Sequence, residues 1–268
     1  MTAPSSYESS VPTSAIQRSS IERPAIEFDH VSFRLNGRAL LQDLVLSVKQ
    51  GETVVLLGRS GSGKTTTLKL INRLLLPTSG EVLVNGRRTA EWDPIRLRRS
   101  IGYVIQDGGL FPHFTVERNI ALVPRIENWP RARVEARVRE LLAIVGLSDE
   151  LASRYPSQLS GGQRQRVGVA RALAADPPIL ILDEAFGALD PITRSAMQKE
   201  FRALQQRMRK TVIFVTHDLR EALLMADRIA LMEEGRLIVD LPVGEFSRSQ
   251  DPLCRAYQEA FSGLPDAG

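Results

Sequence analysis

The sequence has a single cysteine among its 268 residues and no long apolar run. One thiol, that of Cys254, excludes an internal disulfide and a metal cluster built on cysteines, and it suits a reducing compartment. No stretch of 18 or more apolar residues occurs, so no segment is expected to span a membrane. The N-terminus also lacks the charged and then apolar order of a secretory signal. These absences favour a cytoplasmic protein.

A strong charge excess is lacking as well. The net charge is +4, and the basic residues are scattered among acidic ones. A solvated surface explains this distribution better than a nucleic-acid or anionic-lipid site, so we expect no nucleic-acid partner. The 43% apolar and 25% charged content is ordinary for a globular protein. A chain of this length forms one large domain or two small ones.

The most informative motif is the segment Gly58–Thr65 (GRSGSGKT), which matches G-x-x-x-x-G-K-[ST]. The short, apolar, β-branched stretch Thr53–Leu57 precedes it and predicts a buried parallel strand. Leu68, Ile71 and Leu75 follow at helical spacing. A strand, a glycine-rich loop and a helix in this order are what a phosphate-binding loop requires.

Each part of this phosphate loop (residues 58–65) has a physical role. Glycines let the main chain approach an anion, and successive N–H groups and the helix N-terminus face it. Lys64 reaches the β- and γ-phosphates, and Thr65 offers its hydroxyl to Mg²⁺. The sequence therefore predicts a nucleoside triphosphate held by Gly58, Arg59, Ser60, Gly61, Ser62, Gly63, Lys64, Thr65 and Thr66.

Strand and helix patterns organise the rest of the chain. Two strand-like stretches between Ile26 and Val48 flank Asn36-Gly37, a hairpin signal, and Val82–Asn85 is a further short strand. Ile179–Leu182 and Thr211–Val215 are apolar strands that follow the helical region. The predicted fold class is α/β, with a parallel-sheet core, an early antiparallel portion and a helical insertion.

Helical spacing marks two long segments. Val134, Val138, Leu141 and Val145 step by four, three and four residues, and Gly146 follows as the predicted C-cap. One face of a later helix, most simply a core face, carries Met197, Phe201, Leu204 and Met208.

Polar side chains follow the carboxyl ends of the apolar strands. In open α/β sheets these ends converge on one ligand site. Asp183 follows one strand and fits the role of positioning Mg²⁺, and Glu184, one residue on, fits the general base for an attacking water. Glu184 could instead favour the next helix through its charge. His217 could be an ordinary strand-end histidine. Because Glu184 and His217 lie beside other strand ends that carry polar residues, we favour a functional role for both.

The segment Leu159–Gln163 (LSGGQ) has a structural and a functional reading. Ser160 and Gln163 form a capping box that opens a helix. Two consecutive glycines weaken a helix start by roughly 1 kcal/mol each relative to alanine. Bare N–H groups that face an anion would explain why the two glycines are there.

This segment resembles the LSGGQ signature of ATP-binding cassette (ABC) ATPases, and the resemblance extends from about Ile26 to Asp240. It implies a P-loop NTPase fold with an ABC-type antiparallel β subdomain and a helical subdomain. It implies ATP and Mg²⁺ as cofactors. It also implies a head-to-tail dimer of two copies with two ATP molecules at the interface.

The resemblance also implies roles for individual residues. Gln106 matches the Q-loop glutamine, which contacts Mg²⁺ and the attacking water, and His217 matches the switch histidine on the γ-phosphate. Asp190 matches the D-loop, Ala188-Leu189-Asp190, which crosses the dimer interface, and it is also a good helix N-cap before Pro191. The signature segment would bind the ATP of the opposite subunit through Ser160, Gly161, Gly162 and Gln163. The implied catalytic residues are Glu184, His217 and Gln106, and the implied metal ligands are Thr65, Gln106 and Asp183.

Four segments are most similar to ATPases of bacterial uptake systems for glycine betaine, choline and other quaternary-amine osmoprotectants. They are LKLINRL, IGYVIQDGGLFPHFTVERNIALVPRI, RYPSQLSGGQRQRVGVARALAADPP and DEAFGALDPITR. The chain departs from the family in two residues. Leu35 replaces the aromatic that usually stacks on adenine. Phe33 on the same strand face is a candidate substitute, and the alternative is that nothing stacks on adenine. Ala185 replaces a proline.

Residues 1–24 are rich in Ser, Thr and Pro with little apolar content, which predicts a disordered tail, and the resemblance gives the rest of the organisation and the function. We expect a disordered tail over residues 1–24, an ABC ATPase domain over 25–245 with its helical subdomain at about 107–175, and a short C-terminal tail over 246–268 without room for a regulatory module. The expected function is an ABC importer ATPase at the cytoplasmic face of the inner membrane. Its partners would be integral membrane permease subunits and, indirectly, an extracytoplasmic solute-binding protein. The alternatives are an exporter ATPase and a soluble ABC ATPase outside transport.

Overall fold

The strand β3 (Thr53–Leu57) is buried along its whole length and separates two hydrophobic clusters. Val55 and Leu57 face one cluster, and Val54 and Leu56 face the other. A strand covered on both faces is typical of a parallel sheet, and this explains the uninterrupted apolar sequence. The computed structural model describes residues 23–106, 109–187 and 189–262. All but two residues of the predicted tail 1–24 lie outside these ranges.

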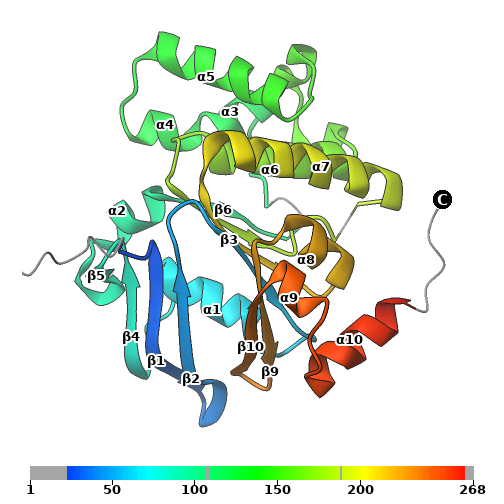
Figure 1. Cartoon of the computed structure of the whole chain (residues 1–268). Coiled ribbons are helices and arrows are strands. Elements are labelled where there is room, and N and C mark those ends of the chain that lie inside the picture. Colours follow the sequence, from blue (N-terminus) through cyan, green and yellow to red (C-terminus); the bar gives the residue numbers. More distant parts are fainter. Residues whose placement is uncertain (1–22, 107–108, 188, 263–268) are drawn as a thin grey trace, which may run out of the picture.

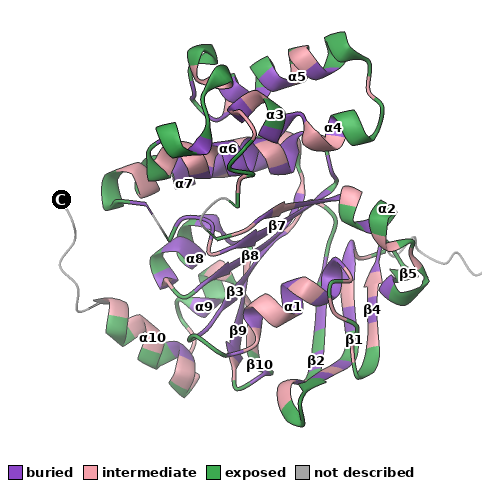
Figure 2. Cartoon of the chain, turned by 180° about the vertical axis from the view of Figure 1, so that it is seen from behind, coloured by how far each residue is buried: buried purple, intermediate pink, exposed green. Residues whose placement is uncertain are grey.

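The central sheet has six strands in the order β10-β9-β3-β8-β7-β6 (Figure 1). All neighbours pair in parallel except β10, which is antiparallel to β9. The other strands are β6 (Ile101–Val104), β7 (Ile179–Asp183), β8 (Thr211–Thr216), β9 (Arg228–Glu233) and β10 (Arg236–Pro242). Figure 2 shows buried residues concentrated on these strands. The predicted parallel core is confirmed.

A second, antiparallel sheet of order β2-β1-β4-β5 covers the other cluster. Its strands are β1 (Ile26–Leu35), β2 (Arg38–Val48), β4 (Ser79–Val84) and β5 (Arg87–Arg88). The predicted hairpin between β1 and β2 is confirmed: Asn36 and Gly37 both have positive φ, 50° and 80°.

Helices pack on both sides of the central sheet. Helix α1 (Lys64–Ile71) follows the phosphate loop and contributes to the cluster beneath the antiparallel sheet. The α-helices α3, α4, α5 and α6 lie together at one end of the molecule (Figure 1) and form the predicted helical insertion. Gly146 lies just past α5 with φ 63°, as predicted from the helix-end pattern.

The remaining bounds follow. The first helices are η1 (Thr89–Glu91), α2 (Pro94–Arg99), α3 (Val116–Ile120), α4 (Leu122–Ile126) and α5 (Arg131–Ile144). Next come η2 (Asp149–Ser153), η3 (Pro156–Gln158), α6 (Gly161–Leu173) and α7 (Pro191–Met208). The last are α8 (Leu219–Met225), α9 (Val243–Phe246) and α10 (Pro252–Ser262).

Two features of this architecture bear on function. Strands β3, β8 and β7 are consecutive neighbours, so the phosphate loop, His217 and Asp183-Glu184 all emerge at one edge of the sheet. Helix α10, within the segment expected to be a short tail, packs near α8 and buries Cys254 completely. Among the described residues, no helix is long and apolar enough to cross a membrane.

Candidate active site

The phosphate loop connects β3 to α1 and leaves the start of α1 without a side-chain cap. Its N-cap is Gly63, with φ 102°, and there is no side-chain cap hydrogen bond among the residues that the structure describes. A Cβ on Gly63 would lie 2.8 Å from the Leu40 carbonyl oxygen, so both the space and the backbone angle require glycine here. Uncapped N–H groups at a helix N-terminus form an anion-binding site.

Lys64 lies inside this loop, with only 5% of the residue exposed. Its Nζ donates to the carbonyl oxygens of Gly58 and Arg59, each at 2.7 Å, and to Ser62 Oγ at 3.4 Å. Burial lowers the pKa of Lys64, while the charges of Glu184 and Asp183 oppose that shift. The ammonium group is therefore held among the atoms that would surround a phosphate.

Asp183 at the end of β7 is linked to two residues from other elements. The hydroxyl of Thr65 donates to Asp183 Oδ1 at 3.0 Å, and the hydroxyl of Tyr103 donates to Oδ2 at 3.2 Å. Burial raises the pKa of the Asp183 carboxyl, and the bonds from Thr65 and Tyr103 oppose that shift. A carboxylate and a threonine hydroxyl at this distance fit Mg²⁺, which binds few protein oxygens alongside water and phosphate oxygens.

Glu184 and His217 form a second pair at the same edge. Their closest atoms, Glu184 Oε1 and His217 Nδ1, are 3.5 Å apart. Glu184 has φ 46°, a conformation that costs free energy in a residue with a side chain. Its backbone N–H donates to Val215 O at 3.0 Å, which anchors it to β8. Backbone strain is thus present at a residue predicted to be catalytic.

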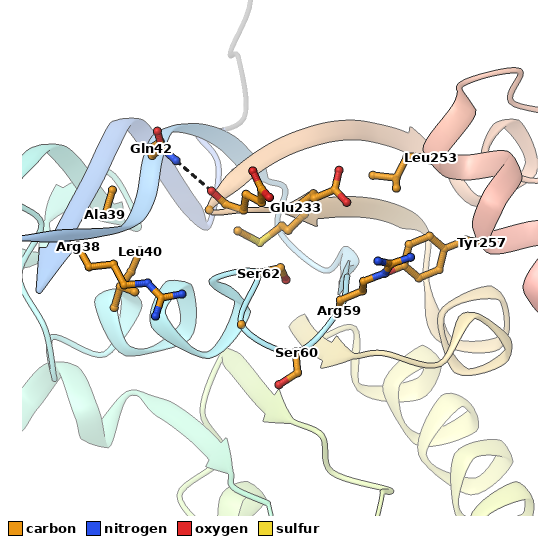
Figure 3. A pocket seen from close by; sticks show the side chains of 14 residues that line it. Arg38, Ala39, Leu40, Gln42, Arg59, Ser60, Ser62, Glu233, Leu253 and Tyr257 are labelled. Carbon is orange, nitrogen blue, oxygen red and sulfur yellow. Dashed lines mark hydrogen bonds between the residues drawn. The ribbon is translucent and has the colours of Figure 1, made fainter.

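Three cavities border the loop. The smallest, of about 170 Å³, is lined by Leu40, Ser60, Gly61, Gly63, Lys64, Thr65, Thr66 and Glu184. A second, of about 500 Å³, lies between Arg59 and Ser60 of the loop, Glu184, His217 and α10. A third, of about 460 Å³, lies between the phosphate loop, the start of β2, the β9–β10 turn and α10 (Figure 3). Figure 3 shows the Arg59 side chain beside Tyr257 of α10. Volumes of a few hundred Å³ are usual for small-molecule sites.

The signature segment (residues 159–163) lines none of these three cavities. Ser160 is the N-cap of α6, and its capping box with Gln163 is confirmed by bonds of 3.2 and 2.9 Å. A Cβ on Gly162 would lie 3.0 Å from Thr193 Cγ2, so close packing on α7 is one reason for this glycine. These residues therefore do not complete the phosphate site of their own chain.

Asp190 is the N-cap of α7, and the Thr193 N–H donates to its Oδ1 at 3.0 Å. Hydrogen bonds from Thr193 lower the pKa of Asp190. The capping reading of Asp190 is thus confirmed. Ala188 of the D-loop lies outside the described residues.

The structure corrects the prediction for Phe33. Its side chain is 7% exposed and packs in the cluster beneath the antiparallel sheet, while Leu35 is 53% exposed. The β1–β2 register shifts between Phe33 and Arg34, but the extra residue, Leu40, is on β2, so Phe33 and Leu35 still alternate regularly along β1. Leu35 is the last residue of β1 and lies outside the cluster that buries Phe33. Because the Phe33 ring is buried in the core, we expect it to offer no free face to adenine.

Gln106 follows β6 and is exposed, and within the described residues it makes no hydrogen bond to Asp183 or Thr65. Residues 107–108, next to it, lie outside the described ranges. Sequence reasoning missed Tyr103, Leu40 and Tyr257. Of these, only Tyr103 could have been suspected from the sequence. A tyrosine in a short buried strand needs a hydrogen-bond partner for its hydroxyl, and β6 pairs with β7, the strand that carries Asp183.

Comparison with known proteins gives a family match. Residues 41–187 match the family model described as "ABC transporter".

Similar proteins include ATP-binding proteins of uptake systems. The chain is 50% identical over 202 residues to the glycine betaine/carnitine/choline transport ATP-binding protein OpuCA of Bacillus subtilis, covering 75% of this chain and 53% of that protein. It is 50% identical over 213 residues to the glycine betaine uptake system ATP-binding protein YehX of Escherichia coli, covering 80% and 69%. It is 54% identical over 194 residues to the osmoprotectant import ATP-binding protein OsmV of Salmonella typhimurium, covering 72% and 51%. The chain spans about half the length of two of these relatives.

Solved structures have the same fold. The dimeric ATP-binding cassette MJ0796 bound to ADP and Pi superposes with a TM-score of 0.75 at 33% identity, covering 81% of this chain and 98% of that chain. The protein cbiO1 of Clostridium perfringens, part of the transporter complex cbiONQ, superposes with a TM-score of 0.79 at 28% identity, covering 91% and 97%.

Proposed function

This chain belongs to the ABC transporter family, and from that membership we propose that it is the ATP-hydrolysing subunit of an importer for glycine betaine or related quaternary amines. The observation that carries ATP hydrolysis is the arrangement at one sheet edge. Thr65 contacts Asp183 at 3.0 Å, and Glu184 lies 3.5 Å from His217, both beside the buried Lys64. These side chains provide a phosphate site, a metal site and a base at one edge of the central sheet.

The residues divide the chemistry as follows. Lys64 and the N–H groups at the start of α1 bind the β- and γ-phosphates. Thr65 and Asp183 hold Mg²⁺, which when bound neutralises negative charge on the phosphates. Glu184 accepts a proton from the attacking water as the water oxygen bonds to the γ-phosphorus. The bond from that phosphorus to the bridging oxygen breaks, and ADP leaves. His217, held against Glu184, contacts the γ-phosphate.

A second copy completes the site. The signature segment lines none of the three cavities at the phosphate loop of its own chain. The related cassette MJ0796 has been solved as a dimer. We therefore assign Ser160 and Gly162 to the γ-phosphate of ATP held by the opposite subunit. Closure of this dimer on ATP and its reopening after hydrolysis would drive permease subunits at the cytoplasmic face of the inner membrane. An extracytoplasmic solute-binding protein would supply the solute.

Uptake by cells tests the importer assignment. Deletion of the gene should abolish accumulation of labelled glycine betaine or choline, and a plasmid copy should restore it, whereas a Lys64→Ala copy should not. Unchanged uptake together with loss of an efflux activity would support an exporter instead. A purified ATPase that retains no membrane partner on gentle detergent extraction would support a role outside transport.

A further inference from the structure

A buried carboxylate, that of Glu221, lies beside the catalytic edge without a part in the chemistry above. It is in the first turn of α8 and only 5% exposed. Its Oε1 accepts from Gln198 Nε2 at 2.8 Å, and its Oε2 accepts from the Thr216 hydroxyl. Burial raises the pKa of Glu221, and the bond from Thr216 opposes that shift. Burying a carboxylate costs free energy that an apolar side chain of similar size would not. The residue therefore needs an explanation beyond packing.

Hydrogen bonds of Thr216 hold the backbone on both sides of His217. Thr216 is 1% exposed, and its hydroxyl accepts from the Asp218 N–H at 3.0 Å while it donates to Glu221. Thr216, on one side of His217, is thus bonded to the carboxylate, and Asp218, on the other side, is bonded to the Thr216 hydroxyl. The His217 side chain itself is 63% exposed and meets Glu184 at 3.5 Å. An exposed side chain keeps a defined direction only when its backbone is fixed.

The other oxygen of Glu221 connects this loop to α7. Gln198 lies two turns into α7 and is 7% exposed. The helix begins after its N-cap Asp190, six residues beyond Glu184. The network therefore joins α7, the helix that follows Glu184 along the chain, to the segment that carries His217.

We propose that Glu221 is a positioning residue that fixes His217 against Glu184 and couples its placement to α7. The inference rests on the proposed ATPase function, whose geometry it explains. A simpler role is an acidic residue favouring the helix dipole of α8. That role does not require burial, and α8 is already capped by Asp218, which accepts from the Arg220 N–H at 2.8 Å.

Two glutamines on α7 provide a matched pair for the test. Gln205 lies seven residues after Gln198 on the same face and is 6% exposed, but it bonds to Arg202 and the Gly51 carbonyl instead of Glu221. Both Gln198→Leu and Gln205→Leu remove one buried amide. We expect Gln198→Leu to lower kcat about tenfold, with the Kd for ATP changed less than about twofold, because only orientation is lost. Gln205→Leu should leave kcat near the wild-type value. Equal kcat in the two variants would overturn the proposal.

A second readout does not depend on catalysis. The chain has three histidines, His30, His113 and His217, so ring signals in the NMR spectrum can be assigned by single substitutions. Gln198→Leu should shift or broaden the His217 signals alone, and Gln205→Leu should not. Glu221→Gln, which keeps the volume of the side chain, should have the same effect on His217 and serves if Gln198→Leu does not fold. An unchanged His217 signal in either variant contradicts the proposal even where kcat falls. A wild-type protein that does not hydrolyse ATP would instead refute the proposed function, and the NMR test of positioning would still stand.

Discussion

Thr65 and Asp183 are 118 positions apart in the sequence, and a hydrogen bond of 3.0 Å joins the hydroxyl of one to the carboxylate of the other. The bond connects the helix after the phosphate loop to the carboxyl end of β7. It brings two oxygens of the kind that Mg²⁺ prefers to the same point. The neighbouring carboxylate of Glu184 and the ammonium group of Lys64 surround that point. The predictions below test what each of these groups contributes.

Lys64→Ala should abolish tight ATP binding. Lys64 Nζ is held 2.7 Å from two carbonyl oxygens inside the phosphate loop, where no other mobile cation is predicted at the β- and γ-phosphates. Equilibrium binding of a fluorescent ATP analogue measures the Kd. Near-normal affinity in a folded variant would remove the basis of the nucleotide site.

Glu184→Gln should preserve ATP binding and slow hydrolysis by about 10²- to 10⁴-fold, the usual contribution of a general base. The amide keeps the volume of the side chain but cannot accept the proton of water. The closed, ATP-bound dimer should accumulate, and size-exclusion chromatography with and without ATP would detect it. Full turnover by the variant would exclude Glu184 as the base.

Asp183→Asn should stabilise the nucleotide-free protein while it abolishes Mg²⁺-dependent hydrolysis. Burial raises the pKa of Asp183, so its charged form is disfavoured in the fold, and the amide removes that charge. The amide oxygen can still accept from the Thr65 hydroxyl. A gain of roughly 1 kcal/mol would raise Tm by about 2–4 °C in a protein of this size. Thermal unfolding without Mg²⁺ measures the gain, and a fall in Tm would show that the carboxylate stabilises the fold.

The sequence predicted those parts of the site that lie next to each other along the chain. The phosphate loop follows β3 directly, and Asp183-Glu184 and His217 each follow an apolar strand whose sheet position is set by parallel pairing. Residues that reach the site from elements distant in the sequence could not be predicted from such local patterns. Tyr103 approaches Asp183 only because β6 pairs with β7, and Tyr257 approaches Arg59 only because α10 folds back on the core.

Phe33 shows a different limit of sequence reasoning. Regular alternation along β1 predicted one face for Phe33 and Leu35, but the core cluster covers Phe33 and ends before Leu35, the last residue of the strand. How far a strand face is covered depends on what packs against it, and the strand itself does not show this. The six-stranded order likewise depends on tertiary packing, although its parallel character was predictable from the fully apolar strands.

The burial of Phe33 leads to a prediction that separates stability from binding. Phe33→Ala should destabilise the protein by about 3–5 kcal/mol, because it leaves a cavity in the core. It should leave the Kd for ATP nearly unchanged below the unfolding temperature. Leu35→Tyr, at a 53% exposed position, should strengthen ATP binding, since an aromatic stack on a base is worth about 1–3 kcal/mol. Chemical denaturation measures the stability of both variants, and ATP titration measures their Kd. A large rise in the Kd of Phe33→Ala, with no gain in Leu35→Tyr, would restore Phe33 as the adenine contact.

The signature segment should act on the ATP of the opposite subunit, and complementation between two defective chains tests this. A Ser160→Arg chain keeps its own phosphate loop, so it should bind ATP normally. It should fail to hydrolyse, because a charged, bulky side chain at the N-terminus of α6 blocks closure of the dimer. Mixing it with a Lys64→Ala chain leaves one interface with an intact phosphate loop facing an intact signature segment. Activity should return in the mixture and rise with the concentration of the second chain. Each chain alone is the control. If purified Ser160→Arg protein hydrolyses ATP at the wild-type rate as a monomer, the site is complete in one chain and the dimer mechanism is wrong.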